Sequence, residues 1–210
     1  MKTVILAVGL LTLCGFISAE PQDKVTLVSE NLIKNPDFSK GNDFPDDWSM
    51  MLTSPDVFNV KWIHDANNGN YIYLESLGAD YSGYIMQKVK VKKGVWYRLK
   101  VCLNHSMGRG LIWLYGYDGD NKPLLFDHRK YLSSFVGNPL VPHFVRKELM
   151  NGSEDASWRD EIFDFQNSDD KGNIQPSILR VAVGIYFTNA KIMIKSIEMW
   201  EIKKMGSKEK

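Results

Sequence analysis

Aromatic and basic side chains alternate with aliphatic ones in the segment that begins at Arg109 and ends at Tyr117. Successive side chains of a β-strand point to opposite faces of a sheet, so the intervening residues face outward if Ile112 and Leu114 face the core. The outward residues of this pattern are Arg109, Leu111, Trp113, Tyr115 and Tyr117. Tyr and Trp combine an apolar ring with a polar tip. Such a row is suited to stack on the apolar faces of sugar rings while polar atoms bind the hydroxyl groups.

Two further segments add polar residues to this surface. In the segment 177–187, Arg180 and Tyr186 alternate with inward aliphatic residues, and the small residues Ala182 and Gly184 lie between them. The same alternation points Asn104 outward. The small residues predict a trough between larger side chains. The candidate ligand-binding residues are therefore Trp113, Tyr115, Tyr117, Arg109, Arg180, Tyr186 and Asn104.

The main alternative is that Trp113 and Tyr115 pack beneath the long segment 122–157, which would bury the cleft. That segment is rich in Pro and Gly, and insertions of this length are commonly functional or flexible loops. A short helix is compatible with residues 143–150.

Lysines alternate with apolar residues in the segment 83–92, where Lys88, Lys90 and Lys92 share one face. Lysines in this pattern are typical of a solvated face or a guarded sheet edge. We favour that interpretation over an anion-binding site.

Five acidic residues are candidates for the paired carboxylates of a glycosidase: Glu154, Asp155, Asp160, Glu161 and Asp164. They alternate poorly and border a loop, so we interpret them as a solvated turn and strand edge. The sequence contains no motif for an activated serine, a zinc protease or a phosphate-binding loop. It therefore favours binding over catalysis, and no catalytic residue is assigned.

The sequence gives little support for a metal or cofactor. The four histidines lack the paired spacing of a zinc site. Asp118, Asp120 and Asn121 match part of a calcium loop, but the required glycine and terminal acid are missing. We expect no metal ligands and no cofactor.

The first 19 residues have the features of a secretory signal peptide: Lys2, an apolar run over residues 4–17, and Ser18-Ala19 before the cleavage point. Cys14 lies in this run, but Leu13 before it is not the small residue that a lipid-anchoring site requires. We expect a secreted protein, extracellular or periplasmic, without a membrane span.

Removing the signal peptide removes Lys2 and takes the net charge from +1 to 0. A neutral chain gives no electrostatic case for binding nucleic acid. Cys102 is the one cysteine that remains, so no internal disulfide can form, and we expect a half-buried, unreactive thiol. We expect a monomer.

The rest of the chain is a succession of short strand patterns without a βαβ rhythm. Strands are expected at 57–64, 71–75, 83–91, 95–105, 109–118, 158–165, 177–187 and 191–202. These predict an all-β fold, a two-sheet antiparallel jelly-roll sandwich. We expect one domain over residues 20–202, with a long insertion near 122–157 and a polar tail at 203–210.

Three stretches carry a resemblance to a known family. Residues 31–41 form an Asn-Leu-x-x-Asn-x-x-Phe-x-x-Gly run that is followed by Pro45 and Trp48. Residues 87–99 match a Gln-x-Val-x-Val-x-x-Gly-x-x-Tyr-x-Leu hairpin, and 179–200 is similar to a closing pair of strands. In this order they resemble the secreted jelly-roll carbohydrate-binding modules that accompany xylanases and glucanases, of the galactose-binding-domain-like fold. The turn residues of 31–48 predict strand, loop and strand there.

The resemblance implies that one concave sheet binds glycan through outward residues, without catalysis. Such modules often hold a structural calcium ion. Here Ser39 follows Phe38 where an acid is expected, and Lys195-Ser196-Ile197 stands where the last strands should supply an Asp pair. Both departures argue against that ion.

Three functions follow from the sequence. The first is a non-catalytic module that binds a poly- or oligosaccharide. The second is a polysaccharide hydrolase or lyase on a β-sandwich. The third is an extracellular protein-interaction domain, which the absence of an accompanying catalytic domain keeps open.

Overall fold

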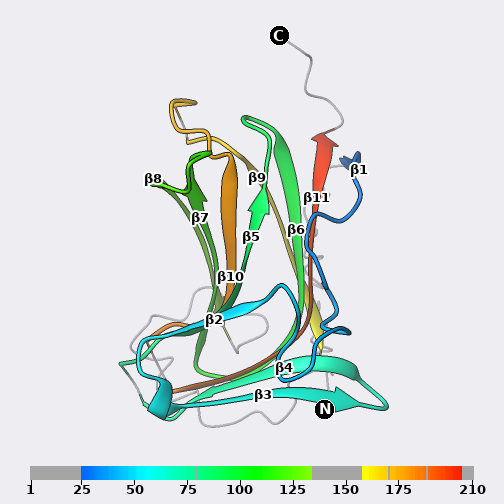
Figure 1. The fold of residues 1–210 in the computed structure, drawn as a ribbon, viewed down its shortest axis with the longest axis vertical. Coiled ribbons are helices and arrows are strands. Elements are labelled where there is room, and N and C mark those ends of the chain that lie inside the picture. Colours follow the sequence, from blue (N-terminus) through cyan, green and yellow to red (C-terminus); the bar gives the residue numbers. More distant parts are fainter. Residues whose placement is uncertain (1–24, 79, 134–157, 170, 188, 205–210) are drawn as a thin grey trace, which may run out of the picture.

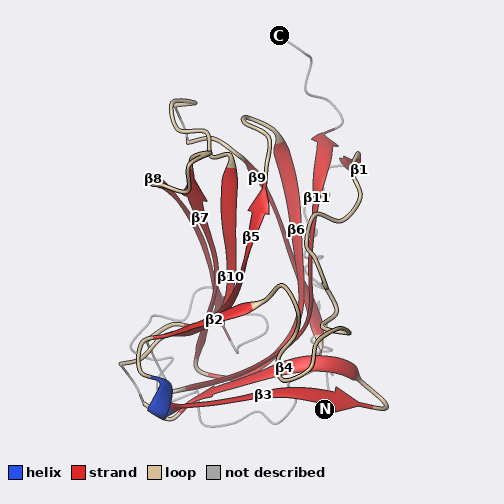
Figure 2. Ribbon diagram, in the orientation of Figure 1, coloured by secondary structure: helices blue, strands red, loops and turns tan. Residues whose placement is uncertain are grey.

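The computed structural model describes residues 25–78, 80–133, 158–169, 171–187 and 189–204. Within these ranges the chain is built almost entirely of strands, with one 3₁₀ turn at η1 (Pro55–Val57). The strands form two packed sheets, and every strand pair is antiparallel (Figures 1 and 2). The expected all-β jelly-roll sandwich is confirmed.

The six-stranded sheet has the order β3-β4-β11-β6-β9, and β1 also pairs with β11. Its strands are β1 (Val25–Leu27), β3 (Phe58–Asp65), β4 (Gly69–Ser76), β6 (Trp96–Met107), β9 (Arg159–Gln166) and β11 (Ala190–Lys204). The long strand β11 pairs with β4 over residues 190–194, with β6 on its other side over 191–201, and with β1 over 202–204. A register shift between Ile194 and Ser196 accompanies its bend (Figure 1).

The five-stranded sheet has the order β2-β5-β10-β7-β8. Its strands are β2 (Ser49–Leu52), β5 (Gly83–Lys90), β7 (Arg109–Tyr117), β8 (Pro123–Ser133) and β10 (Ile178–Ile185). Strand β10 is central, with β5 on one side and β7 on the other. Its neighbours fix which side chains share the outer face of this sheet.

The core lies between the two inner faces, where each strand contributes every second residue. Fully buried aliphatic residues include Leu99 and Val101 of β6, and Val181 and Val183 of β10. Burial of such side chains stabilises the fold by roughly 1.5–3 kcal/mol each. Cys102 is free and half-buried, and burial raises the pKa of its thiol, as does nearby Asp160. This environment agrees with the expected unreactive thiol.

The segment 31–48 is wrongly predicted as strand, loop and strand. Between Asn31 and Trp48 the chain runs as turns and bends, with one isolated bridge between Gly41 and Pro45. The loop is anchored instead by Phe38 and Trp48, which are buried and pack edge to face at 5.3 Å. A strand cannot form here because the backbone of Asn35 is left-handed, with φ at +47°, which is typical of a turn.

Strand β8 occupies residues that the sequence analysis assigned to a long insertion. Its inward positions Leu124, Phe126 and Leu132 alternate with outward ones, but His128 and Lys130 share their side of the strand. Those polar inward residues, together with Pro123 at the start, obscured the period-two pattern. The expected signal peptide, the short helix at 143–150 and most of the tail lie outside the described residues. No helix among the described residues is long and apolar enough to cross a membrane.

Candidate functional site

The predicted parity of β7 is confirmed. Ile112 and Leu114 are fully buried and belong to the core between the sheets. Trp113 and Tyr115 point to the opposite side of the sheet and are partly exposed. The row that the sequence singled out therefore lies on the outer face of the five-stranded sheet.

Four rings on this face form a continuous series of edge-to-face contacts. Tyr84 of β5 lies 5.9 Å from Trp113, Trp113 lies 5.8 Å from Tyr115, and Tyr115 lies 5.4 Å from Tyr117, between ring centroids. We call this series the aromatic ladder. Tyr84 comes from a different strand, so the ladder crosses β10 and fixes the four rings relative to one another.

A second aromatic group extends the same face. Tyr131 of β8 faces Leu111 in register and lies 5.6 Å from Tyr186, which lies 4.9 Å from Phe187. Tyr131 is 54% exposed and Phe187 is 51% exposed. Aromatic residues gathered on the outer side of one sheet are unusual, and exposed apolar patches commonly mark binding surfaces.

The trough predicted at Ala182 and Gly184 is not open. Ala182 is fully buried in a small cluster with Tyr84 and Leu111, against which Trp113 also packs. A side chain at Gly184 would meet the backbone of Gly83 and Tyr84. The small residues thus make room for neighbouring rings and for close strand packing.

Polar contacts hold Trp113 in one orientation. Its indole Nε1 donates a hydrogen bond of 2.7 Å to the Asp127 carboxylate. Arg129 binds the same carboxylate through two nitrogens, and its guanidinium carbon lies 5.2 Å from the Trp113 ring centre. The hydrogen bond to Asp127 raises the pKa of Arg129, and this effect is larger than that of burial, which lowers the pKa. Arg129 covers one face of the indole, so a ligand would stack on the other face or on Tyr115.

Tyr117 was predicted to face outward and does so, but it is only 4% exposed. Two cations, one from β5 and one from β10, cover its ring: Lys88 Nζ at 4.5 Å and the Arg180 guanidinium carbon at 5.0 Å. Burial raises the pKa of Tyr117, and the positive charge of Arg180 acts in the opposite direction. Tyr117 is therefore covered and does not itself form the outer surface, while the Arg180 guanidinium lies over its ring.

The remaining predicted site residues divide between the two sheets. Arg109 begins β7, where its carbonyl accepts a hydrogen bond from the Tyr186 amide, so both lie at one end of the aromatic face. Asn104 lies on β6 of the other sheet, is buried, and faces Met193 of β11 in register. The structure therefore brings six of the seven predicted residues together and leaves Asn104 apart.

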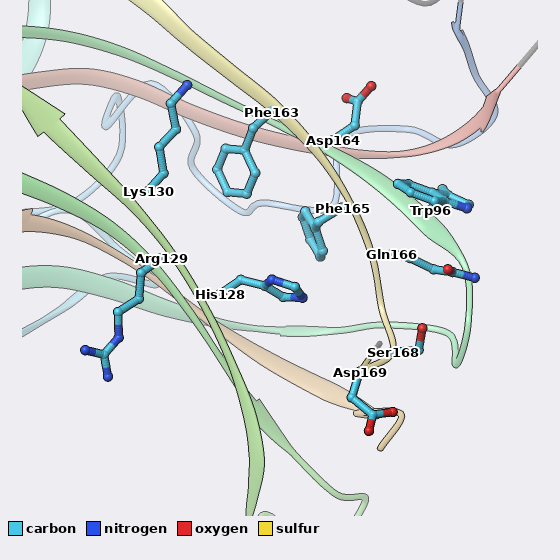
Figure 3. A pocket seen from close by; sticks show the side chains of 10 residues that line it. All are labelled: Trp96, His128, Arg129, Lys130, Phe163, Asp164, Phe165, Gln166, Ser168 and Asp169. Carbon is cyan, nitrogen blue, oxygen red and sulfur yellow. The ribbon is translucent and has the colours of Figure 1, made fainter. Parts of the chain in front are cut away.

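A hollow of about 570 Å³ lies at the open edge of the sandwich, between β8 and β9 (Figure 3). Rings of Phe163, Phe165 and His128 line it, with Lys130 and Asp164 nearby. Lys130 and Asp164 are already engaged, by Glu161 at 2.9 Å and by Arg98 at 2.8 Å. These two charges are therefore already paired, and Arg129, Gln166, Ser168 and Asp169 add further polar groups to the lining.

The acidic residues weighed for catalysis do not form a pair in the part of the chain that the structure describes. Asp160 binds Lys100 at 3.1 Å, Asp164 binds Arg98, and Glu161 binds Lys130 and Arg159. Burial alone would raise the pKa of Glu161, but hydrogen bonds from Lys130 and Arg159 lower it overall. A lowered pKa is the opposite of what a general acid needs. Glu154 and Asp155 lie outside the described residues.

No cluster of three or more His, Cys, Asp or Glu side chains suited to hold a metal ion occurs among the described residues. In the N-terminal loop, the Asn35 side-chain amide lies between two backbone carbonyls, those of Lys40 at 2.8 Å and Asp46 at 3.0 Å. The loop is thus closed by an amide rather than by carboxylates.

No protein-family model and no curated protein sequence matches this chain. Solved structures do match it in fold. The enzymatically active domain of tailspike protein 4 from bacteriophage CBA120 aligns with a TM-score of 0.58 at 12% identity, over 81% of this chain and 21% of that one. Two carbohydrate-binding structures align over nearly their whole length. TmCBM61 in complex with β-1,4-galactotriose has a TM-score of 0.50 at 13% identity and covers 82% of this chain and 99% of its own.

The second is a CBM4 structure, with a TM-score of 0.51 at 12% identity, which covers 80% of this chain and 99% of its own. This chain spans about a fifth of the tailspike domain but covers nearly the whole length of the two modules. At these identities the likeness is one of fold. The chain has the two-sheet jelly-roll fold found in carbohydrate-binding modules.

Proposed function

We propose that this protein binds a poly- or oligosaccharide on the outer face of the five-stranded sheet. Trp113 and Tyr115 stack on sugar rings, while Arg180 and the Asp127–Arg129 pair bind hydroxyl groups. The observation that carries the proposal is the aromatic ladder, which lies on the side of the sheet that faces away from the core. The shared fold with TmCBM61 and CBM4 supports it.

The geometry suits a rigid binding surface. Edge-to-face contacts and the bond to Asp127 already fix the Trp113 ring. A ring that is ordered before the ligand arrives loses little side-chain entropy on binding. The surface should therefore use a small contact area efficiently and still bind with modest affinity.

We propose binding without catalysis, in a secreted protein. The described carboxylates of β9 are each engaged by a basic side chain, which leaves no acid and base facing one substrate there. Sugar specificity would come from polar groups that lose a partner when the wrong hydroxyl is present.

The test is retention of the protein without residues 1–19 in gels that contain different soluble polysaccharides, and its binding to a glycan array. Trp113→Ala should weaken binding to the best glycan at least about tenfold, or about 1.4 kcal/mol. Tyr115→Ala should weaken it as well, and it serves as the test if Trp113→Ala fails to fold. Circular dichroism checks the fold of each variant.

The matched control is Trp158→Ala. Trp158 is also half-buried and also carries a cation over its ring, Lys195 Nζ at 5.5 Å, but it precedes β9 of the other sheet. This variant should retain full sugar binding. Folded Trp113→Ala and Tyr115→Ala variants that bind glycan as the wild type does would refute the proposal.

A further inference from the structure

Two cations face each other at the centre of the aromatic face. Arg180 of β10 lies directly opposite Lys88 of β5 in the register of the sheet. On its other side Arg180 faces Tyr115 of β7, which in turn faces Asp127 of β8. Like charges directly across a strand pair destabilise a sheet, so this arrangement requires a reason.

Two strand cations on the other sheet, by comparison, lie opposite or beside acids. There Arg98 of β6 faces Asp164 of β9 in register and binds it through two nitrogens, at 2.8 Å and 3.0 Å. Lys100 likewise faces outward beside Asp160 and Glu198. Within the described ranges, by contrast, neither Arg180 nor Lys88 forms an ion pair with a carboxylate. Asp127, the acid in their row, is already bound by Arg129.

Protection of a sheet edge explains only part of this charge. Strand β2 pairs with Gly83–Met86 alone, so the half of β5 that carries Lys88 and Lys90 is a sheet edge, where lysines discourage pairing with another chain. Arg180 lies on β10, which is paired along its length with both β5 and β7. Because Arg180 is not on an edge strand, protection of an edge does not explain its presence.

Both cations are held in place. The Tyr117 ring lies beneath them, and Lys88 also donates a hydrogen bond of 3.0 Å to the Asn121 side chain. Asp118, the acid that follows Tyr117 in the sequence, accepts hydrogen bonds from the Asp120 and Lys122 amides instead of pairing with a cation in the described part of the chain. The two positive charges therefore stay close together over Tyr117, and Arg180 also lies beside Tyr115.

We propose that the sugar bound by this face carries a carboxylate, as a uronic acid does, and that Arg180 and Lys88 bind it. The inference rests on the proposed sugar-binding function and names the class of sugar. A ring stacked on Tyr115 would place its carboxylate, which projects from the ring's rim, about one strand spacing of ~4.8 Å away, over Arg180. The planar guanidinium matches a carboxylate with two parallel hydrogen bonds, and Lys88 adds a second charge. The bound anion relieves the repulsion between the two cations.

The test uses hexasaccharides of galacturonate, glucuronate and mannuronate, each also prepared as its methyl ester, and neutral hexasaccharides of galactose, glucose and xylose. Isothermal titration should show that at least one uronate binds and that esterification weakens it about tenfold or more. Added salt should weaken binding of the uronate but not binding of its ester. Arg180→Gln should remove the preference for the acid over the ester, and Lys88→Gln should reduce it.

The control is Lys61→Gln. Lys61 is an exposed strand lysine over the Tyr73 ring, at 6.0 Å, on the other sheet, and its loss should leave uronate binding unchanged. Thermal unfolding should show that Arg180→Gln is as stable as the wild type at low salt, because its removal ends a repulsion. Binding of neutral and esterified sugars as tightly as uronates, and through Trp113, would overturn this inference and leave the proposed function intact. No binding of any sugar would overturn both.

Discussion

The side chain of Asn35 closes the N-terminal loop, and its role is clear only at the level of single atoms. Its amide donates hydrogen bonds to the carbonyls of Lys40 and Asp46, and its oxygen accepts one from the Lys40 amide. The carbonyl of Asn35 accepts the Trp48 indole N–H at 3.0 Å. One residue thus joins both arms of the loop to the buried ring that anchors it.

Asn35→Ala should therefore destabilise the protein by about 2 kcal/mol. Alanine removes three side-chain hydrogen bonds and also disfavours the left-handed backbone at φ +47°. Urea unfolding measures the loss. Asn35→Gly also lacks the amide, but glycine adopts the left-handed backbone readily. It should therefore lower the free energy of unfolding by less than Asn35→Ala does. A stability of Asn35→Ala equal to that of the wild type would show that the loop is held by Phe38 and Trp48 alone.

At this scale the sequence predicted the direction of side chains well and their exposure less well. Alternation placed Trp113, Tyr115 and Tyr117 on one face, as the structure has them. It could not show that Lys88 and Arg180 would cover Tyr117, because that contact depends on which strands lie beside β7. Asp127 and Arg129 were missed because β8 itself was not predicted.

Strands β8 and β9 each form one edge of their sheet, and charged side chains connect them across the open side of the sandwich. Lys130 of β8 binds Glu161 of β9 at 2.9 Å and the Ile162 carbonyl at 3.3 Å, while Arg159 also binds Glu161 at 3.0 Å. The Glu161 side chain is only 21% exposed. This contact joins the two sheets where the aromatic core is open to a hollow (Figure 3).

The contact predicts a pH dependence of stability. The pKa of Glu161 is lowered in the folded protein, so its stabilising effect is complete above its ordinary value of 4.5 and is lost as the pH falls through the lowered value. Glu161→Gln should be less stable than the wild type by about 1–2 kcal/mol at about pH 7. The difference should shrink as the pH is lowered from about 7 to about 3.

Denaturant unfolding at both pH values measures this difference. Asp160→Asn is the matched control. The Asp160 side chain is 45% exposed in its ion pair with Lys100, so this substitution should cost less stability than Glu161→Gln. A Glu161→Gln deficit that is as large in acid as at neutral pH would show that the side chain acts through packing rather than charge.

Eight of the strands could be predicted because their apolar residues recur at period two between clear turns. The pattern failed where inward positions are polar, as at His128 and Lys130, and where side chains rather than backbone pairing fix the chain, as in the loop around Asn35. Gln87 is buried and bonds the Lys34 backbone and the Asp47 carbonyl, which ties the N-terminal loop to β5. Such contacts join residues up to 53 positions apart, so local pattern does not reveal them.

For the whole molecule, the arrangement of charge and rings distinguishes the two outer faces. On the six-stranded sheet, Arg98 and Lys100 pair with carboxylates across strands, while Lys61 lies over the Tyr73 ring. On the five-stranded sheet, rings line up and Arg180 and Lys88 stand without an acid among the described residues. Strand order creates this difference, since it places β10 between β5 and β7.

The most direct test of sugar binding at this face is the indole region of a ¹H–¹⁵N NMR spectrum during titration with the best glycan. The Trp113 N–H bonds Asp127 on the aromatic face, whereas those of Trp48 and Trp62 bond the buried carbonyls of Asn35 and Phe38. Trp113→Phe assigns its signal. The Trp113 signal should move in proportion to the sugar bound while those of Trp48 and Trp62 stay in place. A Trp113 signal that stays fixed while the glycan binds, especially if that of Trp96 beside the hollow between β8 and β9 moves instead, would contradict the account.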